Sequence, residues 1–219
     1  MFSRVYLTKE DHKILQFVEE FGGITIHEAQ NMFYKTQIKG YEIARRHLSK
    51  LVSYDKLNVS RDYDFNQNIR VTIFLFKSIY YMTKKPPRYH DMLSLDYYSE
   101  LIKNGVNIIY FKREQHWLDS KYSSDAYCCY NIGTKIFFDI LEVVNTKNVE
   151  IKKYRELYES GEPQQLNNYI NMELGGHTKE FPRIILLDDV RHKANLFVNE
   201  NVKVIQLDLK LNNFSKLFI

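Results

Sequence analysis

The first quarter of this chain contains the stretch TQIKGYEIARRHLSKLVSYDKL, residues 36–57. Apolar residues recur in it at the spacing of an α-helix, which predicts one face packed on a core. They are Ala44, Leu48, Leu51 and Val52. A second stripe carries polar and charged side chains at steps of three and four. It comprises Glu42, Arg45, Arg46, Ser49 and Ser53. Two arginines in the middle of a helix favour a helix that lies in the major groove of DNA.

Two shorter helices are predicted before this stretch, and two strands are predicted after it. Thr8 and Thr25 are candidate helix caps, the second with Glu28 three residues later in the pattern of a capping box. Residues 57–61 and 70–76 have the composition of strands and flank a polar turn. Three helices followed by a β-hairpin is the element order of a winged helix-turn-helix domain.

Positive charge is concentrated in this region, although the whole chain of 219 residues has a net charge of only +4. From Lys35 to His90 there are twelve Lys or Arg and four Asp or Glu, a net charge of +8. Basic residues on the third helix and the hairpin predict double-stranded DNA as the partner. The predicted DNA-binding residues are Lys35, Lys39, Tyr41, Arg45, Arg46, Ser49, Lys50, Arg61 and Arg70. The alternative is a winged-helix module that binds another protein.

Composition indicates a cytoplasmic protein with sizeable cores. Hydrophobic residues make up 44% of the chain, no apolar run is long enough to span a membrane, and the N-terminus lacks a secretory signal. The two cysteines, Cys128 and Cys129, are adjacent, and neighbours on a strand point to opposite faces. We therefore expect buried, reduced thiols and no zinc site. No motif for a cofactor is present, so none is expected.

The prolines in Lys84-Lys-Pro-Pro-Arg88 predict a boundary between two domains. We expect a winged helix-turn-helix domain over residues 1–84, a linker over 85–90 and a second domain over 91–219. The second domain has the order helix, three strands, helix, strand, short helix, strand. This order predicts an α/β or α+β fold, with helices on the faces of a mixed sheet.

The same order is similar to the restriction-endonuclease-like core. Those nucleases place an Asp at the second strand and a Glu-x-Lys at the end of the third, where the carboxylates hold magnesium and the lysine orients or activates water. Here we expect Asp125 to open the second strand and Glu142 to lie near the end of the third, but Val144 stands in the lysine position. Lys147 is the candidate replacement, which makes Asp125, Glu142 and Lys147 a degenerate site.

Two close carboxylates repel each other when no cation separates them. We therefore expect Asp125 and Glu142 to show a raised carboxylate pKa or a basic partner. The nearest candidates for that partner follow Glu142 in the chain. They are Lys147, Lys152 and Lys153.

Four motifs run along the chain. They are Ala-Arg-Arg-x-Leu-x-x-Leu from Ala44, a His-Asp pair at residues 90–91, an Asp-Ala pair at 125–126, and Phe-Phe-x-x-x-Glu-Val over 137–143. In these motifs the chain resembles the replication-relaxation family of plasmid and mobile-element proteins from Gram-positive bacteria. The resemblance implies a DNA-binding protein of a plasmid, phage or conjugative element, with a nuclease-like second domain.

The resulting hypothesis is a sequence-specific DNA-binding protein that acts as a transcriptional regulator or as an accessory factor in replication or transfer. We expect a homodimer formed mainly by residues after Pro87, because one winged helix reads few base pairs. The second domain is also a possible surface for a protein partner. No DNA cleavage is expected, because Val144 lacks the charge of a lysine. The alternative is a metal-dependent endonuclease that uses Asp125 and Glu142.

Overall fold

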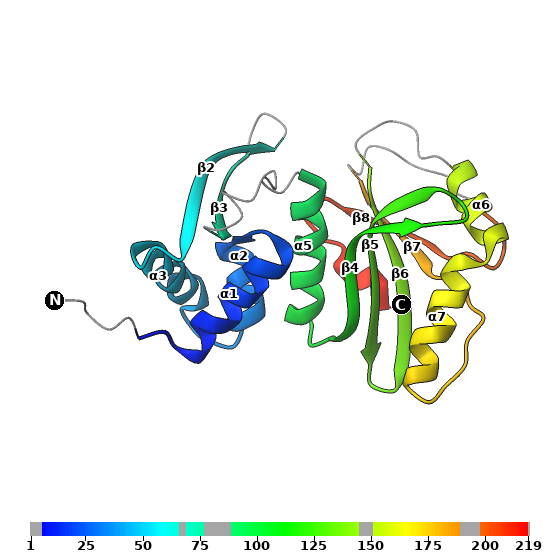
Figure 1. Cartoon of the computed structure of the whole chain (residues 1–219), viewed down its shortest axis with the longest axis horizontal. Helices are drawn as coiled ribbons and strands as arrows, with labels where there is room; N and C mark the ends of the chain where they lie inside the picture. Colours follow the sequence, from blue (N-terminus) through cyan, green and yellow to red (C-terminus); the bar gives the residue numbers. More distant parts are fainter. Residues whose placement is uncertain (1–5, 66–68, 77–88, 145–150, 189–197, 219) are drawn as a thin grey trace. The chain divides into compact units, whose positions relative to one another are not determined.

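The computed structural model describes residues 6–65, 69–76, 89–144, 151–188 and 198–218 (Figure 1). The chain forms two compact units, Met1–Lys103 and Asn104–Ile219. Within the described ranges it is a mixed α+β protein with six α-helices, a three-stranded sheet and a five-stranded mixed sheet. At this level the fold class expected from the sequence is confirmed.

The first unit begins with three helices, and two of them start at the predicted caps. Its elements are α1 (Lys9–Phe21), β1 (Ile24–Thr25), α2 (Ile26–Phe33), α3 (Gly40–Ser53), β2 (Leu57–Phe65), β3 (Ile69–Phe76) and α5 (Tyr89–Lys103). Thr8 and Thr25 each form a reciprocal capping box, with Asp11 and Glu28 respectively. Each box satisfies backbone N–H groups that the first helical turn leaves without partners.

The three strands of the first unit form an antiparallel sheet in the order β1-β3-β2. Strand β2 is longer than predicted, because residues 62–65, expected in the turn, continue the strand. Tyr63 pairs with Val71, and Phe65 pairs with Ile69. Aromatic residues in alternating positions favour a pleated strand, and here they outweigh the turn preference of the intervening aspartates.

Helix α5 packs with the first unit, although the sequence assigned it to the second domain. The ring of Tyr98 lies 5.9 Å from the ring of Phe17 and 5.6 Å from that of Phe21, both on α1. The unit therefore extends to Lys103. The boundary predicted at residues 85–90 rests on two consecutive prolines, whereas the packing of apolar rings sets the limit of the compact unit.

The second unit is built on a sheet whose strands follow one another in chain order. Its elements are β4 (Asn107–Trp117), β5 (Tyr122–Ile132), β6 (Lys135–Val143), α6 (Ile151–Ser160), α7 (Glu162–Glu173), β7 (Arg183–Asp188), β8 (Val204–Asp208) and the 3-10 helix η1 (Phe214–Phe218). Strands β4, β5 and β6 are antiparallel, whereas β6, β7 and β8 are parallel. A parallel pair needs a long crossover, and α6 and α7 lie in the crossover from β6 to β7.

Helices α6 and α7 cover one face of this sheet (Figure 1). The core between the helices and the sheet contains, among others, Tyr127, Ile140, Tyr154, Leu157 and Ile184. The sequence of residues 165–172 predicts a short helix, and the observed α7, Glu162–Glu173, is longer. It begins directly at Glu162, because the following proline is tolerated in a first helical turn.

Cys128 and Cys129 are buried and unbridged, as predicted, and burial raises the pKa of Cys129 to about 12. No helix within the described ranges is both long and apolar enough to cross a membrane. The sequence also predicts a helix cap at Thr146 and a helix over residues 189–197, and both lie outside the described residues.

Candidate functional site

Helix α3 has the two faces that its sequence predicts. Its apolar stripe is buried, with Ala44, Leu48 and Leu51 fully inaccessible and Val52 half-buried. The whole polar stripe is exposed to solvent; it consists of Glu42, Arg45, Arg46, Ser49 and Ser53. The apolar side of α3 therefore packs on the core of the unit, and its polar side faces solvent.

Gly40 allows α3 to begin close to the end of α2. A Cβ atom at this position would lie 2.5 Å from the carbonyl oxygen of Tyr34, which is closer than real Cβ contacts come. Any other residue would push the two helices apart. The glycine thus fixes the place at which the exposed stripe starts.

The basic side chains of the exposed stripe, Arg45 and Arg46, take no part in the packing of the core. The guanidinium of Arg45 lies 3.0 Å from the carboxylate of Glu42, and both side chains are more than half exposed, at 60% and 57%. Such an ion pair stabilises a protein little, so Arg45 can exchange Glu42 for another anion.

The depression beside α3 gathers four of the nine predicted DNA-binding residues, Lys39, Arg45, Arg46 and Ser49. It is lined by Lys39, Glu42, Ile43, Arg45, Arg46 and Ser49. Tyr41 is exposed on the same helix, with its ring 5.1 Å from that of His27. Ile43 was not predicted from the sequence, although it lies three residues before Arg46 at helical spacing.

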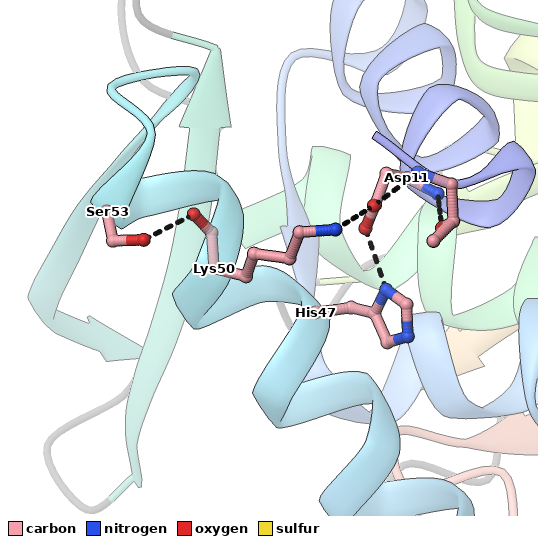
Figure 2. Close-up of polar contacts among 5 residues, drawn as sticks. Asp11, His47, Lys50 and Ser53 are labelled. Atoms are coloured by element: carbon pink, nitrogen blue, oxygen red, sulfur yellow. Dashed lines mark hydrogen bonds and ion pairs between the residues drawn. The ribbon is translucent and has the colours of Figure 1, made fainter. Parts of the chain in front are cut away.

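Two other lysines predicted to bind DNA are engaged inside the unit. The ammonium of Lys50 donates to Asp11 Oδ2 at 2.6 Å, and His47 Nδ1 lies 2.7 Å from the other carboxylate oxygen (Figure 2). Lys35 Nζ donates to the carbonyl oxygen of Ile102 on α5 at 2.9 Å. Both lysines therefore hold helices together in this structure.

Two predicted arginines lie on the hairpin. Arg61 is in β2 and Arg70 is in β3. Their side chains lie outside the described part of the chain.

Asp11 is the buried anchor of α3. Burial by itself would raise the pKa of its carboxyl group, but hydrogen bonds from Lys50, His47 and Thr8 outweigh burial and hold the pKa well below its usual range. Such a carboxylate stabilises the fold above its unfolded pKa, and that stabilisation is lost as the pH falls towards the folded pKa.

Asp11→Asn is therefore expected to cost about 1–3 kcal/mol of unfolding free energy at pH 7. The difference from the wild type should narrow when the pH falls from about 4 towards 2, since the wild-type carboxylate then takes up a proton. Urea unfolding followed by circular dichroism at both pH values measures this. Glu19→Gln, at an exposed position of α1, is the control. If the difference in unfolding free energy between the wild type and Asp11→Asn stayed constant across this pH range, the Asp11 carboxylate would not be the stabilising group.

In the second unit, the structure brings Asp125 and Glu142 together. They lie on the adjacent strands β5 and β6, and the backbone N–H of Val143 donates to Asp125 Oδ2 at 2.7 Å. The sequence predicted that Asp125 opens the second strand. In the structure Asp125 is instead the fourth residue of β5. The strand starts earlier because Tyr122 and Ser124 already pair with β4.

Lys153 on α6 is the basic partner of this carboxylate pair. Its ammonium contacts Glu142 Oε1, and the two side chains are only 13% and 14% exposed. The adjacent Lys152 is 82% exposed and lies 3.4 Å from Glu156, on the solvent side of the helix. Lys147, the candidate from the sequence, lies outside the described residues.

Glu142 is poised to change its charge near neutral pH. Burial raises the pKa of its carboxyl group to about 7, although Lys153 lowers it and the Asp125 carboxylate raises it further. This confirms the expectation of a raised carboxylate pKa with a basic partner. Two carboxylates suit Mg²⁺, which binds one or two of them and keeps several waters. No group of three or more His, Cys, Asp or Glu side chains is placed to hold a metal among the residues described.

The chain matches no protein-family model, no curated protein and no solved structure. The resemblance to the replication-relaxation family therefore stays a prediction, and the function must be inferred from the geometry of the two sites.

Proposed function

We propose that the protein binds double-stranded DNA through the exposed face of α3. The observation that carries this proposal is the division of basic groups on that helix. Lys50 and His47 face inward and fix the helix to Asp11, whereas Arg45 and Arg46 stand in solvent beside a depression. A rigid helix with exposed arginines is what reading a major groove requires.

The order of elements around α3 supports the same proposal. Three helices precede the hairpin β2–β3, and the short β1 joins the hairpin as a third strand. This order supports the interpretation of the first unit as a winged helix-turn-helix, a fold in which the hairpin lies beside the helix that reads DNA. We infer that α3 enters the major groove and that the hairpin contacts the backbone or the minor groove. The biological role is then that of a regulator, or of an accessory factor in replication or transfer.

The salt dependence of DNA binding tests this proposal. Each lysine–phosphate contact releases counterions, so the affinity of the full chain for a duplex should fall steeply as salt rises. Lys39→Ala should reduce the slope of log affinity against log salt by about 1. Fluorescence anisotropy with a labelled duplex measures the slope. Lys121→Ala, at an exposed turn of the second unit, should leave it unchanged. Absence of DNA binding at low salt would leave the protein-interaction module as the better interpretation.

A second candidate function is a metal-dependent endonuclease, and the position of Lys153 favours it. The missing lysine after Glu142 was the sequence argument against catalysis, and Lys153 supplies an ammonium at the same carboxylate from a helix. The strand order β4-β5-β6-β7-β8, with β5 antiparallel to its neighbours, fits a restriction-endonuclease-like core. Asp125 and Glu142 would hold Mg²⁺, which would polarise a phosphoryl oxygen. Lys153 would orient a water molecule through its N–H groups.

Under this second candidate, the protein nicks supercoiled plasmid in the presence of Mg²⁺. The rate should rise as the pH increases through about 7, because a carboxylate must lose its proton before it binds a metal and the pKa of Glu142 is about 7. Glu142→Gln and Lys153→Met should abolish nicking. Lys152→Met is the matched control, since that lysine is the exposed neighbour on the same helix. A wild-type protein that binds DNA and leaves plasmid intact would reject the nuclease and keep the DNA-binding proposal.

A further inference from the structure

The second unit contains a cavity of about 630 Å³ at the end of the sheet where β6, β7 and β8 begin. Small-molecule sites typically measure about 300–1,000 Å³. The cavity lies far from the carboxylate pair, because Lys135 opens β6 and Glu142 lies near its other end. Along β6, Lys135 is seven positions from Glu142, about 23 Å, and the lining residue Phe138 is four positions from it, about 13 Å.

The lining of the cavity is rich in positive charge. It contains four cationic side chains from separate segments of the chain and one carboxylate, that of Glu180. The cationic residues are Lys135, Lys179, Arg183 and Lys203. The three lysines are solvent-exposed at the rim, whereas Arg183 is nearly buried. The charge of Arg183 is matched by the buried carboxylate of Asp139. The three rim lysines outnumber the single carboxylate of the lining, and a bound anion would offset this excess of positive charge.

The wall of the cavity is aromatic and held in place. Phe218 is 40% exposed, and Tyr158 is half-buried. The ring centroid of Tyr158 lies 5.5 Å from that of Phe181, which is buried behind it at 9% exposure. The guanidinium carbon of Arg183 lies 4.5 Å from the centroid of the Phe137 ring. Nη1 of the same side chain donates to the carbonyl oxygen of Leu217 at 2.9 Å. Because Arg183 fixes both the strand and the final 3-10 helix, the cavity is formed without a ligand.

From these observations we propose that this cavity binds a mononucleotide. The lysines at the rim hold the phosphate, and the aromatic wall receives the planar base. A simple anion would use only the lysines, and an apolar molecule would use only the wall. A nucleoside phosphate matches both chemistries in one molecule.

Isothermal titration of the full chain with AMP, ribose 5-phosphate and inorganic phosphate tests the proposal. AMP should bind most tightly, because only AMP uses the aromatic wall. Lys135→Ala and Lys179→Ala should each weaken AMP binding about tenfold, the loss of roughly one charge-assisted contact. Lys210→Ala, at an exposed lysine outside the lining, is the control and should bind as the wild type does.

Three results would overturn the assignment. The first is ribose 5-phosphate binding as tightly as AMP, since the wall would then receive no base. The second is an equal loss of affinity in the Lys210 variant, which would indicate general attraction to a basic surface. The third is no detectable AMP binding at millimolar concentration.

Discussion

Arg183→Ala is expected to lower the unfolding free energy of the second unit by about 3–5 kcal/mol, because it leaves a buried carboxylate without its partner. The Asp139 side chain is fully buried, and Arg183 grips it with two contacts, Nε to Oδ1 at 2.7 Å and Nη2 to Oδ2 at 3.0 Å. The same guanidinium also donates to the hydroxyl of Tyr130.

The single tryptophan of the chain makes this measurement specific to the second unit. Trp117 is buried in the core of that unit, so its fluorescence follows the unfolding of this unit in urea. Arg155→Ala, on the exposed side of α6, is the control and should change the stability by less than about 0.5 kcal/mol. The double variant Asp139→Asn, Arg183→Met should be more stable than Arg183→Ala, because no unpaired charge remains buried. Equal small losses for Arg183 and Arg155 would show that the buried pair does not stabilise the unit.

Replacing Arg45 and Arg46 together by alanine is expected to reduce DNA affinity by about 2–5 kcal/mol, if each arginine loses a phosphate or bidentate base contact. This corresponds to a dissociation constant raised by roughly thirtyfold to several thousandfold. The fold should survive, because both side chains are exposed and the only ion pair of Arg45 within the described residues is the exposed one with Glu42.

Two controls make the result decisive. Circular dichroism shows whether the double variant keeps its helices. Lys13→Ala removes an exposed charge from α1, away from the proposed interface, and should cost less than about 1 kcal/mol of DNA affinity. An unaltered affinity of the folded double variant at moderate salt would reject α3 as the reading helix.

The sequence by itself determined where α1 and α2 begin and which faces of α3 are buried and exposed. Thr8 and Thr25 signal their helices because a hydroxyl followed three residues later by a carboxylate caps a helix without help from the rest of the fold. The burial of Ala44, Leu48 and Leu51 follows from a periodicity that one helix alone displays. In the second unit, the sequence predicted that Asp125 and Glu142 would lie close together and show a raised carboxylate pKa or a basic partner, and adjacent strands bring the two carboxylates together.

Only the tertiary structure decided which charged groups are partners. Lys50 has the same chemistry as the exposed basic residues of α3, yet it pairs with Asp11, thirty-nine residues earlier in the chain. Lys153 and Lys152 are neighbours in sequence, and the packing of α6 on the sheet turns one towards Glu142 and the other to solvent. Patterns of sequence report what a single helix or strand prefers. The partner of a charge depends on which segments meet in the folded core, and that is set by the packing of elements far apart in the chain.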